Sequence, residues 1–268
     1  MRKIRKIRKI WKDFNLCNLF NSVSIIMYFF WRLLLAHLLA DFTFQTDRIA
    51  KWKREDISGV FFHVLIFLFF AVVINYQYLP QKNFAVALMV IAMLHVVEDK
   101  WRAYNIVKYN SPDDIVFFLW DQFVHILFIF VLVPEDPIGA ITEKWVVLAI
   151  IFIAASNFST ILIYFVKKLF YSDACVITQE KYHGIIERVL IVVCFVITGK
   201  WYWIVLSSVV LLVLIERFSM KKINNKLDFS IHNILTSNVM AIILSIIAHG
   251  VWCHLPPPIF LDNFFSPF

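Results

Sequence analysis

Long apolar runs alternate with short polar segments along this 268-residue chain. A helix needs roughly 20 apolar residues to cross a bilayer. Apolar runs that reach or approach this length predict spans near residues 23–44, 59–79, 83–98, 114–133, 144–166, 185–199, 200–218 and 231–252. The third and sixth runs are short, and only Gly199 and Lys200 divide the sixth from the seventh. The pattern therefore predicts an all-α, polytopic transmembrane helix bundle of about eight spans, with counts of seven or nine left open.

The charged residues between these runs alternate in sign. Basic residues gather in the odd-numbered loops: Arg48, Lys51, Lys53 and Arg54; Lys100, Arg102 and Lys108; Lys167, Lys168 and Lys181; and Arg217, Lys221, Lys222 and Lys226. The second loop has Lys82 alone, and the fourth is acidic. Because loops rich in Lys and Arg stay in the cytoplasm, the odd loops are predicted to be cytoplasmic. With eight spans this places the basic N-terminus outside, so either the first segment does not cross fully or the N-terminal arm is an added extension.

Composition supports a membrane protein and distinguishes the two ends of the chain. Hydrophobic residues make up 61% of the chain and charged residues 17%, whereas soluble domains average roughly half and a quarter. Seven basic residues fall within the first twelve positions: Arg2, Lys3, Arg5, Lys6, Arg8, Lys9 and Lys12. We expect this arm to bind the anionic lipid headgroups of the bilayer rather than nucleic acid. The expected organisation is a basic amphipathic extension over residues 1–26, a transmembrane helical domain over 27–254 and a Pro-rich tail over 255–268.

Ionisable side chains interrupt the first four predicted spans. Because such groups are costly inside a membrane, each marks a candidate functional site. Three spans carry a His and an Asp four residues apart, and the second carries one His: His37 and Asp41; His63; His95 and Asp99; Asp121 and His125. Residues at this spacing share one face of a helix and can share a metal ion. We therefore predict a divalent metal (Zn, Mn or Fe) held by some of these seven residues, as in helix bundles that contain di-metal sites.

The positions of these residues within their spans also agree. The His and Asp residues lie at the ends of spans one and three and near the starts of spans two and four. An antiparallel bundle would place them at one level, on the side of the basic loops. Gln45 and Gln122 lie beside them, where they would orient the carboxylates or only bond neighbouring helices. The alternative is that each His–Asp pair satisfies its own hydrogen bonds without a ligand.

The second half of the chain has a sparser set of ionisable residues. Glu187 and Arg188 open the sixth span, and Glu216 and Arg217 close the seventh. Either arginine is a candidate for binding a phosphate or carboxylate headgroup of a substrate through two parallel hydrogen bonds. Pairing between the adjacent Glu and Arg residues at helix ends is an equally good interpretation.

Four short motifs occur in order along the chain. They are LLLAHLLADFTFQTD at 33–47, HVVEDK at 95–100, DQFVH at 121–125 and GIIERVL at 184–190. Together they resemble the bacterial family called domain of unknown function 3307, over residues 31 to about 250. The resemblance implies a multi-span bacterial inner-membrane protein whose biochemical role is unassigned. It also implies a start near the first motif, which agrees with an extension over residues 1–26.

Three functions are compatible with the sequence, and whether the chain is an enzyme is left open. The leading hypothesis is a metal-dependent hydrolase of a lipid or lipid-linked substrate near the cytoplasmic leaflet. A bound metal would activate water, and one of Asp41, Asp99 and Asp121 would act as the catalytic general base. The second hypothesis is a transporter or channel for divalent cations or protons, with the same groups as a relay. The third is a non-catalytic membrane component of an oligomer or a larger complex, in which the polar cluster only locks the bundle.

Overall fold

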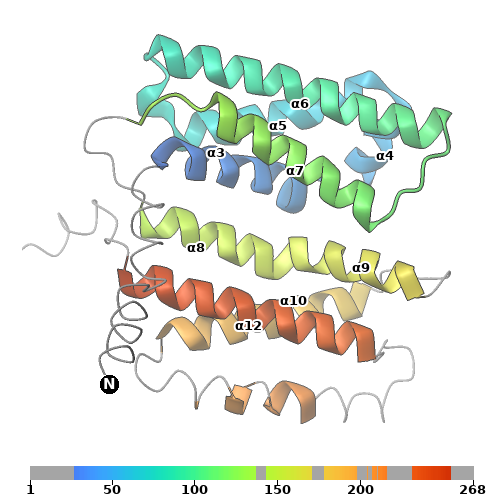
Figure 1. The fold of residues 1–268 in the computed structure, drawn as a ribbon, viewed down its shortest axis with the longest axis vertical. Coiled ribbons are helices and arrows are strands. Elements are labelled where there is room, and N and C mark those ends of the chain that lie inside the picture. The colour runs from blue at the N-terminus through green and yellow to red at the C-terminus, as the bar shows by residue number, and fades with distance from the viewer. Residues whose placement is uncertain are drawn as a thin grey trace, which may run out of the picture.

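The computed structural model describes residues 27–136, 143–170, 178–197, 204, 207–209, 211–215 and 231–254. Helices dominate these residues, and no strand occurs among them, so the all-α prediction is confirmed (Figure 1). The predicted N-terminal extension and C-terminal tail lie outside the described residues. The elements are α3 (Tyr28–Leu38), η1 (Leu39–Phe44), α4 (Asp47–Glu55), α5 (Ile57–Ile74), η2 (Tyr76–Tyr78), α6 (Lys82–Lys108), α7 (Ile115–Leu132), α8 (Lys144–Ile153), η3 (Ala154–Phe158), α9 (Ser159–Phe170), α10 (Thr178–Ile197) and α12 (Ile231–His254).

Helix α3 is the central helix of the first half of the fold. Ten of its eleven residues are buried, because α5, α7 and α8 all pack against it. A helix that is apolar on nearly every side is stable only when it is surrounded in this way. Consecutive helices α3, α5, α6 and α7 run in opposite directions (Figure 1). The C-terminal ends of α3 and α6 therefore lie at the same end of the bundle as the N-terminal ends of α5 and α7.

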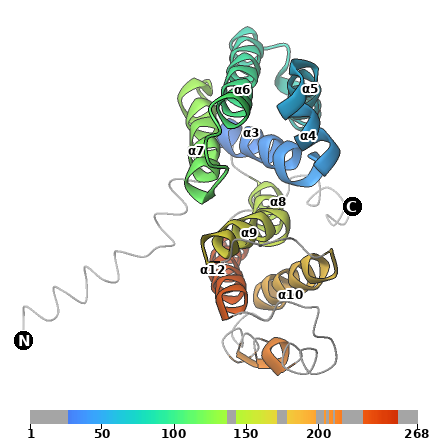
Figure 2. The same cartoon turned by 90° about the vertical axis from the view of Figure 1, so that its right-hand side faces the viewer.

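A long helix joins the two halves of the fold. Helices α8 and α9 continue into one another through η3, a π-helical turn, and form one helical segment, Lys144–Phe170. This segment contacts α3 on one side and α10 and α12 on the other (Figures 1 and 2). Val147, Ile151 and Ala155 on this segment pack against Val192 of α10 and Ala248 of α12. The second half is thus a separate layer, and the segment Lys144–Phe170 attaches it to the first, mainly through α8.

Among the residues that the structure describes, four helices are long and apolar enough to span a membrane: Ile57–Ile74, Ile115–Leu132, Lys144–Phe170 and Asn233–Trp252. Large apolar side chains on α5, among them Phe61, Leu65 and Phe69, are exposed on the outside of the bundle. Exposed apolar surface of this kind indicates contact with lipid. These findings indicate a membrane protein, but the predicted count of eight spans is not confirmed. Helices α6 and α10 lie at predicted spans, but each contains several charged residues and neither is among these four.

Two segments that the charge pattern assigns to loops are helical in the structure. The first predicted loop contains α4, and α6 continues to Lys108, ten residues past the predicted end of its span at 98. Helix α4 begins after Thr46, whose side chain accepts a hydrogen bond from the Ile49 N–H at 3.4 Å. The turn into α5 is stabilised by a hydrogen bond from the Ser58 hydroxyl to Asp56, which lowers the pKa of that exposed carboxyl. The polar segment that forms α4 is thus an amphipathic helix, and it is stabilised by packing across the end of the bundle.

The opposite end of α3 is held by a carboxylate from a distant segment. The backbone N–H groups of Tyr28 and Phe29 donate to Asp136 at 2.8 and 3.0 Å. The first N–H groups of a helix have no partner within the helix, and an anion at this end also interacts favourably with the helix dipole. Nearby, the buried Arg32 donates to the backbone carbonyl of Ile74 at 2.6 Å and pairs with Glu143. Part of the acidic fourth loop therefore has a structural role.

Replacing Asp136 by Ala should destabilise the protein by about 2 kcal/mol, because α3 loses the acceptor for two of its first N–H groups. The expected result is a lower midpoint of thermal unfolding in detergent, with the far end of the bundle unchanged. Asp136→Asn retains one acceptor oxygen, so its unfolding midpoint should lie between those of Asp136→Ala and the parent protein. Equal midpoints for Asp136→Ala and the parent protein would show that these contacts do not stabilise α3.

Candidate metal centre

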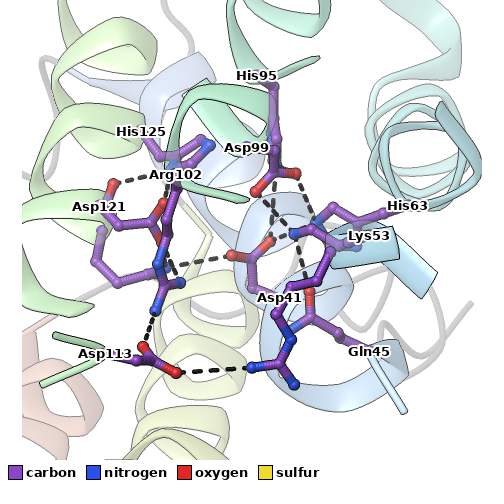
Figure 3. A network of polar contacts seen from close by, with 12 residues as sticks. Asp41, Gln45, Lys53, His63, His95, Asp99, Arg102, Asp113, Asp121 and His125 are labelled. Atoms are coloured by element: carbon purple, nitrogen blue, oxygen red, sulfur yellow. Dashed lines mark hydrogen bonds and ion pairs between the residues drawn. The ribbon is translucent and has the colours of Figure 1, made fainter. Parts of the chain in front are cut away.

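The structure brings all seven predicted His and Asp residues together at one end of the bundle. His37 comes from α3 and Asp41 from η1, His63 from α5, His95 and Asp99 from α6, and Asp121 and His125 from α7. All seven side chains are buried. Figure 3 shows six of them, Asp41, His63, His95, Asp99, Asp121 and His125, turned toward a common centre. The helical spacing of four residues and the alternating directions of the helices account for this convergence.

Asp41 is at the middle of the cluster. His63 Nε2 lies 3.1 Å from Asp41 Oδ1, within hydrogen-bond distance, and His37 Nδ1 and His95 Nε2 lie 3.4 and 3.8 Å from the same oxygen. Asp41 lies on a π-helical turn, the wider helical form that occurs often at functional sites. One carboxylate oxygen thus faces imidazoles from three different helices.

Asp99 joins the cluster to a cation. Its Oδ2 lies 3.6 Å from His95 Nε2 and 3.7 Å from His63 Nε2. Its Oδ1 accepts a hydrogen bond from Lys53 Nζ at 2.7 Å, and Lys53 also donates to Gln45 Oε1 at 3.0 Å. The Asp99 carboxylate is therefore fixed on one side by Lys53 and directed at two imidazoles on the other.

His125 has one ring nitrogen fixed and one directed into the cluster. Its Nδ1–H donates to the Asp121 backbone carbonyl, one turn earlier on α7, at 2.8 Å. This bond leaves Nε2 as the nitrogen with a free lone pair in the neutral ring, which is the arrangement of a metal-binding histidine. The His125 ring lies against that of His95, with 4.2 Å between centroids, and stacks on that of His37 at 5.2 Å.

Several buried polar atoms of the cluster have no hydrogen-bond partner within the part of the chain that the structure describes. They are both ring nitrogens of His37, His63 Nδ1, His95 Nε2, Asp99 Oδ2, Asp121 Oδ1 and His125 Nε2. Leaving buried polar groups without partners is costly. The presence of this many in one place therefore indicates a ligand-binding site. Three overlapping sets have donor atoms within 4.8 Å of one another: His37, Asp41 and His95; His63, His95 and Asp99; Asp99, Asp121 and His125. These donors fit a divalent transition metal.

Gln122 links two of the carboxylates. Its side-chain N–H₂ donates to Asp41 Oδ2 at 3.2 Å and to Asp121 Oδ2 at 3.0 Å. Gln122 is thus placed to orient both carboxylates. Gln45, the other predicted orienting residue, contacts Lys53 instead of a carboxylate.

Three residues that the sequence pattern does not single out complete this region: Lys53 and Arg102, which the pattern assigns to loops, and Asp113. In the structure Arg102 donates to Asp121 Oδ2 at 3.1 Å and to Asp113 Oδ1 at 3.0 Å (Figure 3). Arg102 lies three residues after Asp99, so it shares the face of α6 that carries the site. That spacing is a signal which the sequence did contain.

Arg188, one of the two predicted substrate-binding arginines, is not part of this cluster. Arg188, on α10, donates to the backbone carbonyls of Ala155 and Ser156 at 2.6 and 3.1 Å, and to Thr160 Oγ1 and Ser237 Oγ at 2.7 and 3.1 Å. The two carbonyls belong to η3, where a π-helical turn changes the hydrogen-bond pattern of the helix. The guanidinium thus connects α10 to η3, α9 and α12. Arg217 lies outside the described residues.

The comparisons with known proteins agree with the resemblance noted in the sequence. Residues 29–149 match the model of the family described as protein of unknown function (DUF3307), which confirms that resemblance for this part of the chain. All seven clustered residues lie within the matched region, whereas the motif at 184–190 lies beyond it. No curated protein and no solved structure matches the chain.

Proposed function

We propose that this member of the DUF3307 family is a membrane-embedded, metal-dependent hydrolase of a lipid or lipid-linked substrate. The proposal includes a location in the bacterial inner membrane, with the site near the cytoplasmic leaflet. The observation that carries it is the group of buried imidazole nitrogens and carboxylate oxygens that lack hydrogen-bond partners among the described residues. A purely structural network of four helices would be expected to satisfy these atoms.

The residues divide into metal ligands and a proton acceptor. The ligands are drawn from the two sets that share His95: His37, Asp41 and His95, and His63, His95 and Asp99. His125 Nε2 faces the same space and supplies a further nitrogen. When bound, a divalent metal lowers the pKa of water toward about 7 and so supplies a nucleophile near neutral pH.

Asp121 is the residue that we assign as general base. It lines a cavity of about 180 Å³ beside the cluster. Its Oδ2 is held by Arg102 and Gln122, while its Oδ1 has no hydrogen-bond partner among the described residues. A carboxylate with one oxygen fixed and one free is suited to take a proton from water and pass it to the leaving group.

The electrostatics of the cavity favour a hydrolase over a cation transporter. Lys53, Arg54 and Arg102 line the cavity beside the three Asp residues of the site. With one divalent metal bound at the cluster, the positive charges would exceed those of the four lining carboxylates, which include Asp113, so the cavity would repel a further divalent cation and attract an anionic substrate. The third alternative, a bundle lock without a ligand, predicts neither metal binding nor turnover.

Asp121→Asn tests this assignment. The amide keeps the size of the side chain but accepts protons poorly, so hydrolysis should fall by roughly 10²- to 10⁴-fold while bound metal is retained. The measurement is product release from a panel of ester and phosphoester lipids by protein in detergent, with chelator-treated protein as the zero control. Turnover that continues after complete removal of the metal would contradict a metal-dependent hydrolase. If Asp121→Asn loses its metal together with its activity, Asp121 is a metal ligand. Metal flux into proteoliposomes without hydrolysis would favour the transporter.

A further inference from the structure

The lining of the cavity beside the cluster includes charged residues, called here the charged wall, and large apolar residues, called here the apolar wall. Its charged wall contains Asp41, Asp99, Asp113 and Asp121 together with Lys53, Arg54 and Arg102. Its apolar wall contains Ile106, Phe118, Ile161 and Phe165, with Phe118 and Phe165 stacked at 4.9 Å between centroids. At about 180 Å³ it is smaller than the roughly 300–1,000 Å³ of sites that enclose a whole drug-sized ligand. The cavity is therefore sized for a headgroup and the first atoms of its chain.

The cations of this wall retain hydrogen-bond capacity. Arg102 uses Nη1 for Asp121 and Nη2 for Asp113, and its Nε is buried without a partner in the described part of the chain. A guanidinium has more N–H donors than these two bonds use. Lys53 likewise has one N–H beyond those that it gives to Asp99 and Gln45. Both side chains thus line the cavity with donors left for an anion.

The charge of the wall depends on the metal. Its four carboxylates outnumber its three cations by one. A single divalent metal on the cluster would reverse the sign and leave the wall positive. The site would then attract a group with two negative charges and several acceptor oxygens, which describes the phosphate of a monoester.

We propose that the cavity binds the terminal phosphate of an amphiphilic phosphate monoester, with Lys53 and Arg102 holding its oxygens. This inference rests on the proposed metal-dependent hydrolase and specifies its substrate. The apolar wall receives the first carbon atoms of the lipid, and the two negative charges of a terminal phosphate suit the metal-loaded charged wall better than the single charge of a diester.

The reaction follows from these positions. The oxygen of water forms a bond to phosphorus while the bond between phosphorus and the ester oxygen breaks. Asp121 accepts one proton of the water and returns it to the departing oxygen. The products are the free alcohol of the amphiphile and inorganic phosphate, so atoms and charge balance without any other reactant.

Isothermal titration calorimetry of the metal-loaded protein with inorganic phosphate tests the binding step. Phosphate should bind, and Arg102→Gln and Lys53→Gln should each weaken its binding by about tenfold or more. Matched controls are Lys51→Gln on α4, whose side chain is 74% exposed, and Lys108→Gln on the exposed last turn of α6. Both should bind phosphate as the parent does. Arg102→Lys, which keeps the charge but not the planar donors, should fall between Arg102→Gln and the parent.

Two further results separate this inference from the proposed function. Metal content is measured in every variant, so that loss of phosphate binding can be distinguished from loss of metal. In a second assay, dihexanoyl phosphatidic acid should release inorganic phosphate and dihexanoyl phosphatidylcholine should not. The monoester proposal would be wrong if the protein binds metal but no phosphate at millimolar concentrations, or if all variants bind phosphate equally. Neither result would contradict the metal site. A parent protein without metal would overturn both.

Discussion

Asp99→Ala should remove most of the bound metal and abolish hydrolysis. Asp99 belongs to two of the three sets of donor atoms, and its Oδ2 is buried beside His63 and His95. Loss of a residue that merely orients a ligand costs roughly 10–100-fold in metal affinity, and loss of a ligand should cost more. Elemental analysis of the purified variant measures this directly.

Asp99→Ala also leaves Lys53 without its carboxylate partner, so folding must be controlled. A buried charge that loses its partner destabilises a protein by roughly 3–5 kcal/mol. Asp99→Asn together with Lys53→Gln removes both charges and keeps the side-chain sizes, so this double variant should fold and still lack metal. If the folded double variant binds metal as tightly as the parent, Asp99 is not a ligand.

Gly59→Ala should reduce phosphate binding and hydrolysis strongly while the metal remains. A Cβ at residue 59 would lie 2.5 Å from the backbone carbonyl carbon of Trp52 and 2.7 Å from the backbone nitrogen of Lys53. Helix α4 would therefore have to move away from α5, at a cost of about 1–3 kcal/mol. Because Lys53 lies on α4, its contacts with Asp99 and with the cavity would be displaced.

The informative readout for Gly59→Ala is the ratio of phosphate affinity to metal content. Gly250→Ala is a matched control, since a Cβ there would meet no atom within 4 Å. Phosphate affinity should fall in Gly59→Ala and stay unchanged in Gly250→Ala. Unchanged phosphate affinity in Gly59→Ala, with a normal metal content, would show that the position of α4 does not determine substrate binding.

The convergence of the His and Asp residues was predictable because its signal is local and periodic. His37 and Asp41, His95 and Asp99, and Asp121 and His125 share helix faces by their spacing alone, and alternating spans place them at one level. The cations of the cavity were harder to recognise. The hydrophobic pattern reports which segments are apolar, and it does not show that the polar segment carrying Lys53 folds back as a helix across the end of the bundle. Arg102 was missed because α6 extends past its apolar stretch.

Two other features had no reliable signal in the sequence. Arg188 lies beside an apolar stretch, and this position is compatible with headgroup binding. In the structure, however, its N–H groups donate to backbone carbonyls of η3. A π-helical turn has no pattern of apolar residues that would reveal it. The span count had no clear signal for a related reason, because helices such as α6 combine a long apolar stretch with several charged residues, including Lys82, Glu98 and Asp99.

The most direct test of the metal centre is the metal content of the purified protein, measured by elemental mass spectrometry after supply of zinc, manganese and iron. The parent protein should contain stoichiometric metal. Folded His37→Ala, Asp99→Ala and His125→Ala should contain less, with Asp99→Ala losing most, while Asp136→Ala at the other end of α3 should retain the parent content. A folded, monodisperse parent protein that binds none of the three metals would contradict the account, and the His and Asp residues would then form a proton relay or a structural network.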